Sequence, residues 1–136
     1  MEKSSKANLL VVDDDPDLLR LLAIRLKANA YDVTAVESGQ KALAAIAAAR
    51  PDLVLTDLRM EGIDGMALLR HAQEVDTDLP VVMITGHGDI QIAVEAMRLG
   101  AYDFVEKPFE PERLLDIVKR ASEKRRLVLE NRRLRQ

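Results

Sequence analysis

The sequence contains no cysteine, so neither a disulfide framework nor a thiolate metal site can form. It also has no apolar stretch near the roughly 20 residues that a membrane-spanning helix needs, and no signal-peptide core follows its polar start. These absences predict a cytoplasmic protein that does not associate with membranes. At 136 residues, the chain can bury the core of one domain without covalent cross-links.

The chain also lacks a strong excess of either charge, because its formal net charge is −3. Residues 122–136 nevertheless carry six basic and two acidic side chains, which leaves −7 for residues 1–121. A basic tail can bind nucleic acid. This tail has no aromatic residue, and leucines at helical spacing separate its charges. A solvated helix face is therefore the favoured interpretation, and we expect no direct nucleic-acid binding.

Strand and helix patterns alternate along the chain. Short runs at residues 9–12, 32–36, 53–57, 81–84 and 102–106 predict strands. Amphipathic or alanine-rich segments predict helices at residues 16–28, 40–50, 66–74 and 90–99 and from residue 111 onward. Asp15, Ser38 and Asp89 are the expected N-caps, whereas Asn29 and Gly100 are the expected left-handed helix stops.

This alternation predicts an α/β fold of the flavodoxin-like (βα)5 type, a sandwich whose five-stranded parallel sheet has the order 2-1-3-4-5. The first and third strands are then neighbours, and the carboxyl ends of all strands meet at one edge. No stop signal interrupts the last helical pattern, so we expect that helix to extend into a coiled-coil-like linker.

Polar side chains follow four of the predicted strands at the point where each strand ends. Asp13 and Asp14 follow the first, Asp57 ends the third, Thr85 follows the fourth and Lys107 follows the fifth. Three crowded carboxylates require either a bound proton or a cation. Because oxygen ligands without cysteine or histidine favour Mg²⁺, the sequence predicts a magnesium site at this edge. Helix capping is the simpler explanation for an acid after a strand, and it suits Asp15 better than these residues.

A carboxylate beside Mg²⁺ is a nucleophile for phosphoryl groups, which makes Asp57 the candidate for an aspartyl phosphate. The Lys107 ammonium would neutralise charge on the phosphoryl oxygens, and the Thr85 hydroxyl would donate a hydrogen bond to one of them. The simpler alternatives are a surface lysine at a turn and a threonine with ordinary strand propensity. The Lys107-Pro108 bond is a candidate for the cis form.

From residue 9 to residue 121, the chain resembles the receiver domain of bacterial two-component response regulators, a family of the CheY-like superfamily. The resemblance is carried by Val-Val-Asp13-Asp14, Asp57 with Arg59-Met60, Thr85-Gly86 and Lys107-Pro108-Phe109. It implies that a sensor histidine kinase, or a small phosphodonor, transfers a phosphoryl group to Asp57. It also implies Mg²⁺ ligands from Asp57, Asp14, the Arg59 backbone carbonyl and, through water, Asp13.

The same resemblance implies that Thr85 and Phe104 form the family's conformational switch, although Phe104 is also explained as a simple core aromatic. One departure from the family pattern is Met60-Glu61-Gly62, because the usual loop reads Met-Pro-Gly. The missing proline loosens the loop, and Glu61 adds an acid near the site. We expect an altered phosphodonor preference or phosphoryl lifetime.

More narrowly, the chain resembles receivers of NtrC/DctD-type activators of sigma-54 transcription. The matching segments are residues 85–90, 100–104 and 127–134. This resemblance implies a receiver domain at residues 1–121 and a helical linker at residues 122–136. In the complete protein, an AAA+ ATPase and a DNA-binding domain would follow.

The end of the chain carries a heptad pattern that predicts a homodimer through a coiled coil. The proposed seam positions are Ile117, Lys124, Asn131, Arg120, Leu127 and Leu134. Asn131 is the type of polar seam residue that fixes the register of two helices. The alternative is a monomer with a frayed tail.

Two other functions fit parts of the pattern. A Mg²⁺-dependent phosphohydrolase of similar topology would use Asp57 in turnover, but such enzymes carry an acid two residues later, where this chain has Arg59. A pseudo-receiver would act only as an interaction module, but the acids of the site are intact. We therefore expect a phosphoacceptor rather than an enzyme, with at most slow self-dephosphorylation.

Overall fold

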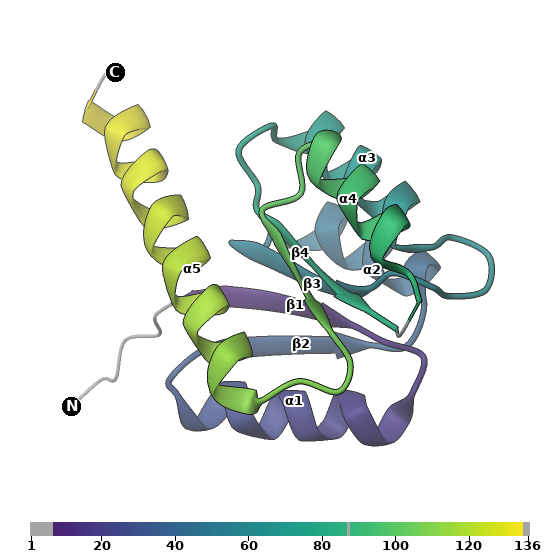
Figure 1. Cartoon of the computed structure of the whole chain (residues 1–136). Coiled ribbons are helices and arrows are strands. Elements are labelled where there is room, and N and C mark those ends of the chain that lie inside the picture. Colours follow the sequence, from purple (N-terminus) through teal and green to yellow (C-terminus); the bar gives the residue numbers. More distant parts are fainter. Residues whose placement is uncertain (1–6, 87, 135–136) are drawn as a thin grey trace.

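A five-stranded parallel sheet lies between two layers of helices in the computed structural model, which describes residues 7–86 and 88–134 (Figure 1). The strands are β1 (Asn8–Val12), β2 (Asp32–Val36), β3 (Leu53–Asp57), β4 (Val81–Thr85) and β5 (Asp103–Glu106). The helices are α1 (Pro16–Ala28), α2 (Gly39–Ala48), α3 (Gly65–Val75), α4 (Ile90–Arg98) and α5 (Pro111–Leu134). The sheet order is β2-β1-β3-β4-β5, which confirms the predicted fold.

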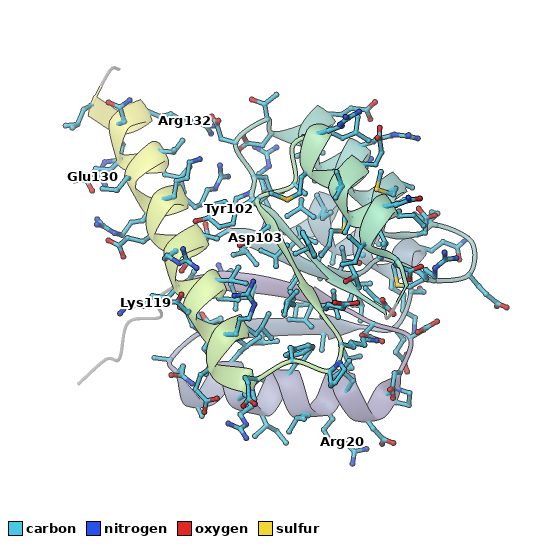
Figure 2. All side chains as sticks on the ribbon, in the orientation of Figure 1. Arg20, Tyr102, Asp103, Lys119, Glu130 and Arg132 are labelled. Carbon is cyan, nitrogen blue, oxygen red and sulfur yellow. The ribbon has the colours of Figure 1, made fainter. Side chains whose placement is uncertain are left out.

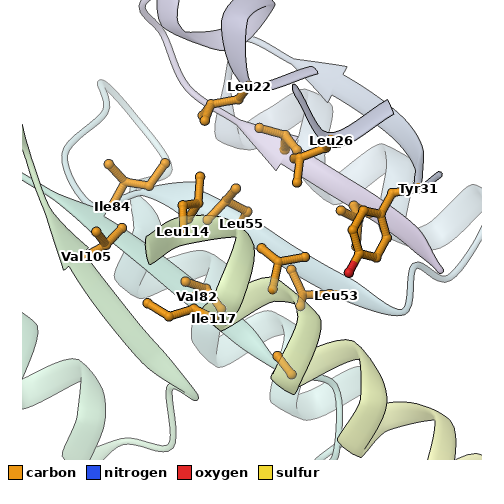
Figure 3. Packing of buried hydrophobic residues seen from close by; sticks show 14 of the residues in the cluster. Leu22, Leu26, Tyr31, Leu53, Leu55, Val82, Ile84, Val105, Leu114 and Ile117 are labelled. Atoms are coloured by element: carbon orange, nitrogen blue, oxygen red, sulfur yellow. The ribbon is translucent and has the colours of Figure 1, made fainter. Parts of the chain in front are cut away.

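The sheet divides the core into two apolar clusters. Successive residues of a strand point to opposite faces, so Leu9 and Val11 join the cluster under α1 and α5 while Leu10 and Val12 join the other. Figure 3 shows Leu22 and Leu26 of α1 and Leu114 and Ile117 of α5 around the β3 and β4 side chains of the first cluster. The second cluster lies under α2, α3 and α4. Because β3 and β4 are buried on both faces, their sequences are continuous apolar runs.

Two of the predicted N-caps act as caps, and one does not. The Asp15 carboxylate accepts from the backbone N–H of Asp17 at 3.0 Å, and the Ser38 hydroxyl accepts from that of Lys41 at 3.2 Å. Asp89 occupies the N-cap position of α4 but makes no capping hydrogen bond. Its carboxylate instead accepts from the Arg59 side chain, because a hydrogen bond from a charged guanidinium is stronger than one from a backbone amide.

The predicted left-handed stop at Asn29 is wrong by one residue. Asn29 has φ −101°, and Ala30 takes the left-handed conformation with φ 72°. The Ala30 N–H donates to the Lys27 carbonyl and the Tyr31 N–H to the Leu26 carbonyl, which is a Schellman motif. Asn29 is instead the C-cap residue of α1, and its side-chain amide donates to the Arg25 carbonyl at 2.9 Å. The predicted stop at Gly100, with φ 112°, is confirmed.

The last helix, α5, continues without interruption to Leu134, as predicted. Only part of the predicted heptad seam is exposed and able to contact a second helix. Ile117 is fully buried in the core under the sheet, so it cannot contact a second helix, whereas Leu127 and Leu134 are 54% and 76% exposed. The error arose because the same helix packs on the sheet first and leaves it later. All helices in the described part of the chain are too short or too polar to cross a membrane.

The left-handed alanine generates a test of the fold. An L-residue in this conformation costs roughly 1–2 kcal/mol, whereas glycine adopts it without strain but has more freedom in the unfolded chain. We therefore expect Ala30→Gly to raise the free energy of unfolding by about 0.5–1 kcal/mol in urea titrations. Ala28→Gly, inside α1, should lower it by a similar amount. A destabilised Ala30→Gly variant would contradict the assigned backbone conformation.

Candidate functional site

The strand register brings the predicted acids together at the carboxyl edge of the sheet. Val12, the last residue of β1, lies opposite Thr56 of the neighbouring β3. The next residues along the two strands, Asp13 and Asp57, therefore emerge side by side. One carboxylate oxygen from each of Asp13, Asp14 and Asp57 lies within 4.8 Å of the other two. Three acids from two distant segments thus form one cluster, as the sequence predicts.

The acids differ in their exposure and in their hydrogen bonds. Asp13 is fully buried and Asp57 is 7% exposed, whereas Asp14 is exposed to solvent. The Asp13 Oδ1 atom accepts from the backbone N–H of Asp15 at 2.8 Å, which fixes the direction of its side chain. Its Oδ2 atom is buried and has no hydrogen-bond partner within the described residues. A buried carboxylate oxygen of this kind is available to a cation.

The fifth strand brings a positive charge to the acids. The Lys107 ammonium lies 3.8 Å from the Asp13 Oδ2 atom and 3.7 Å from the Asp57 Oδ2 atom. Its backbone N–H donates to the Thr85 carbonyl at 2.8 Å, so the end of β4 holds the residue in place. The bond from Lys107 to Pro108 is cis, as the sequence suggested. Lysine and acids therefore face one another across the end of β3.

Burial and repulsion both disfavour ionisation of the central acid. Loss of hydration and the neighbouring Asp13 charge raise the pKa of Asp57 to about 6, although Lys107 opposes them. Burial likewise raises the pKa of Asp13, against the hydrogen bond from Asp15 and the Lys107 charge. A single ammonium does not neutralise three carboxylates. A divalent cation would lower both pKa values by favouring the charged forms.

The donor set at this edge suits Mg²⁺. All three side chains offer hard oxygen atoms, one of them a buried oxygen with no protein donor among the described residues, and exposed Asp14 leaves space for waters. Mg²⁺ prefers one or two carboxylates and keeps several waters. The residues present therefore fit the ion that the sequence predicted. The assignment of individual ligands, including the Arg59 carbonyl, remains a prediction.

The two residues of the predicted switch lie on neighbouring strands beside this cluster. Thr85 is fully buried, and its hydroxyl donates to the Val105 carbonyl at 3.4 Å, a long and therefore weak hydrogen bond. Phe104 is half-buried and packs against the apolar cluster under α4. A weakly held hydroxyl can change partner at small cost. The arrangement is compatible with a switch and does not test it.

One contact of the site was missed from the sequence. The Arg59 Nε atom lies 2.9 Å from both carboxylate oxygens of Asp89, and its guanidinium joins the loop after β3 to the N-cap residue of α4. The Arg59 side chain holds the pKa of Asp89 below its ordinary value. The sequence prediction gave a role only to the Arg59 backbone. The available signal was the pairing of opposite charges in two loops that come after neighbouring strands.

The raised pKa of Asp57 predicts a pH-dependent stability without divalent cations. The folded protein binds this proton more tightly than the unfolded chain, so the free energy of unfolding falls as pH rises from about 4 to about 6. Asp57→Asn removes the ionisable group and therefore this fall in the free energy of unfolding. At pH 7 the variant should be more stable than the wild type by about 2–3 kcal/mol, and the difference should disappear below about pH 4.

Thermal or urea unfolding in EDTA across this pH range measures the effect. Asp32→Asn, a change at an exposed acid on the edge strand, serves as the control and should keep the pH dependence of the wild type. A destabilised Asp57→Asn variant at pH 7 would mean that Asp57 is not crowded by buried negative charge.

Known proteins share both the sequence and the fold of this chain. The family model described as "Response regulator receiver domain" matches residues 9–119. The C4-dicarboxylate transport transcriptional regulatory protein DctD of Pseudomonas aeruginosa is 50% identical over 131 residues, which is 96% of this chain and 28% of that protein. The nitrogen assimilation regulatory protein NtrX of Azorhizobium caulinodans is 44% identical over 131 residues, covering 95% of this chain and 29% of that protein.

Solved structures agree. NtrX from Brucella abortus superimposes with a TM-score of 0.87 at 43% identity, over 96% of this chain and 30% of that one. A response regulator receiver domain protein from Clostridium thermocellum superimposes with a TM-score of 0.85 at 28% identity, over 90% of this chain and 98% of that one. The chain thus spans less than a third of the DctD and NtrX relatives. It belongs to the receiver domain family of two-component response regulators, and the DctD and NtrX relatives named above are of the NtrC/DctD type.

Proposed function

We propose that Asp57 accepts a phosphoryl group from a sensor histidine kinase and that the other residues of the cluster support this transfer. The single observation that carries the proposal is the convergence of Asp13, Asp14, Asp57 and Lys107 at the end of β3, with carboxylate oxygens within 4.8 Å and the ammonium 3.7 Å from Asp57. Asp57 lies next to the lysine and, unlike the fully buried Asp13, retains some exposure to solvent.

In the proposed transfer, an Asp57 carboxylate oxygen forms a bond to phosphorus as the bond from phosphorus to the donor breaks, and the donor leaves with that electron pair. Asp57 must be ionised for this step, which Lys107 favours. The lysine then contacts the phosphoryl oxygens, where its charge offsets theirs. Asp57, Asp14, the Arg59 carbonyl and, through water, Asp13 would hold Mg²⁺, which supplies further positive charge to these oxygens when bound.

The response to phosphorylation is proposed to begin at Thr85. Its hydroxyl exchanges the long hydrogen bond to Val105 for a charge-assisted bond to a phosphoryl oxygen. The movement opens space beside β4 into which the half-buried Phe104 ring turns. Such a change shifts a two-state equilibrium by a few kcal/mol and leaves the fold intact.

The output is proposed from the relatives, whose names identify them as regulators of transcription. Residues 1–121 act as the receiver and residues 122–136 as a linker, and in a longer protein an AAA+ ATPase and a DNA-binding domain would follow. Exposed Leu127, Asn131 and Leu134 form the remaining seam for a homodimer. Phosphorylation would change how two copies associate. The chain itself is a phosphoacceptor with at most slow self-dephosphorylation.

Incubation with acetyl phosphate and Mg²⁺ tests the acceptor. Intact-mass spectrometry should show one added phosphoryl group on the wild type and on the control Asp32→Asn. Asp57→Ala should show none, because the proposal assigns the acceptor carboxylate to Asp57 alone. Lys107→Met should reduce the yield at least tenfold by removing the charge that stabilises the phosphoryl oxygens.

The other outcomes identify the other functions. Continuous release of phosphate with no lasting adduct would indicate a phosphohydrolase. Absence of any adduct on the wild type, even after incubation with a panel of phosphorylated histidine kinases, would indicate an interaction module and would overturn the proposal.

The proposed dimer seam is tested separately by light scattering, with and without beryllofluoride as a phosphoryl mimic. Leu127→Glu places a charge on the exposed seam, so we expect it to shift the population to monomer in whichever state is dimeric. Lys119→Glu, at an exposed position earlier on the same helix, is the control and should have little effect. A wild type that is monomeric in both states would exclude the homodimer.

A further inference from the structure

A second ionic cluster lies at the opposite end of the sheet from the acids. Asp76, directly after α3, accepts from the Arg125 Nη2 atom at 2.8 Å and from the Arg132 Nη1 and Nη2 atoms at 3.1 and 2.8 Å. Arg132 also contacts the Asp78 Oδ2 atom at 2.7 Å. Figure 2 shows Arg132 extending from α5 toward the loop between α3 and β4. Arg125 and Arg132 thus meet at the carboxylate of Asp76, although they are 49 and 56 positions away from it in the sequence.

The carboxylate of this cluster is held rigidly. The Asp76 side chain is only 5% exposed, and its Oδ1 atom also accepts from the Asp78 N–H at 3.0 Å. Its backbone N–H donates to the Ala72 carbonyl, and its carbonyl accepts from Leu79. The hydrogen bonds from Arg132 and Arg125 hold the pKa of Asp76 well below its usual range. Asp76 is therefore a fixed anionic anchor rather than a flexible surface acid.

The buried Arg125 side chain depends on the Asp76 carboxylate. The Arg125 side chain is 3% exposed, and two of its nitrogen atoms, Nε and Nη1, have no hydrogen-bond partner in the part of the chain that the structure describes. A buried guanidinium with a single paired nitrogen is costly unless an opposite charge is close. Arg125 would therefore not remain in place without Asp76.

Other ion pairs of α5 cannot fix the helix against the domain. The Arg120–Asp116, Arg126–Glu123 and Arg126–Glu130 pairs all lie within α5 and are exposed. Such pairs contribute only a few tenths of a kcal/mol to a helix. Apolar packing is also sparse beyond residue 122, because Leu127 and Leu134 are exposed and Val128 and Leu129 are only half-buried. The ion pairs of Arg125 and Arg132 with Asp76 and Asp78 join this part of α5 to the loop between α3 and β4.

The spacing of the arginines decides which face of the helix is turned inward. Arg125 and Arg132 are seven residues apart, which is close to two helical turns, so they share one face. Leu127 and Leu134 are each two residues further along and lie about 200° around the helix from them. Pairing of the arginines with Asp76 therefore turns both leucines outward. The Lys124 ammonium, 5.8 Å from the centre of the Tyr102 ring, adds a contact on the inward side.

We propose that Asp76, Arg125 and Arg132 form a clamp that holds residues 123–134 of α5 against the loop between α3 and β4 and sets the direction in which the helix leaves the receiver. Arg125 is the buried half of the clamp. Arg132, whose side chain is 42% exposed, is the half that can be released. The clamp does not depend on phosphorylation of Asp57, and its test does not use that site.

Hydrogen exchange of the backbone amides at residues 127–134 measures whether the clamp holds. Arg132→Ala should increase their exchange rates about tenfold, because the helix end separates more often from its anchor. Arg133→Ala removes the same charge one residue along without touching Asp76, and it should change the rates less than about twofold. Asp76→Asn should have a larger effect than Arg132→Ala, since it also leaves Arg125 unpaired.

These variants separate a clamp from other causes of protection. Arg132 is partly exposed, so its replacement leaves the core intact. The Arg132→Ala variant therefore tests the clamp even if Asp76→Asn fails to fold. Protection within one molecule is independent of protein concentration, whereas protection by a dimer is lost on dilution, so each exchange series is repeated at tenfold lower concentration. Equal rates in Arg132→Ala and Arg133→Ala, or unprotected amides at 127–134 in the wild type, would overturn the proposal.

Discussion

The rest of the structure depends on three carboxylates being held closer together than their charges favour. Parallel pairing of β1 with β3 places Asp13 next to Asp57, and burial removes the water that would screen them. The pKa of Asp57 rises to about 6 as a result. An arrangement that lowers stability at neutral pH is retained at functional sites when a ligand relieves it. A cation bound here would relieve the repulsion, and in the proposed function the same cation would prepare Asp57 to react with a phosphoryl group.

The acidic cluster and the Asp76 cluster lie at opposite edges of the sheet, and α5 extends from one to the other. The acids and Lys107 occupy the edge formed by the carboxyl ends of the strands, and α5 begins four residues after Lys107. The same helix passes under the sheet, where Leu114 and Ile117 join the core, and reaches Asp76 at the opposite edge. One continuous helix therefore runs from beside the acidic cluster to the opposite edge of the sheet. In the proposed function, this helix would be the physical route from Asp57 toward an output domain.

Sequence patterns predicted the features that depend on chain direction and periodicity. The strand order and the convergence of Asp13, Asp14, Asp57 and Lys107 followed from the alternation of elements, because parallel strands end at one edge. The left-handed stop after α1 was placed one residue early, because asparagine adopts that conformation more readily than alanine, whereas the Schellman hydrogen bonds put it at Ala30. The seam assigned to Ile117 failed because periodicity does not reveal which partner a helix face meets. The Arg59–Asp89 and Asp76–Arg132 contacts join residues far apart in the sequence, and no local pattern specifies such pairs.

Calorimetric titration with Mg²⁺ at pH 6 and pH 8, in buffers of different ionisation enthalpy, tests the central claim most directly. We expect one bound ion, release of a proton at pH 6 but not at pH 8, and loss of binding in Asp14→Asn, because the ion displaces the proton that crowding places on the acids. Absence of binding, or binding at pH 6 without proton release, would contradict the claim that these carboxylates are crowded and relieved by a cation.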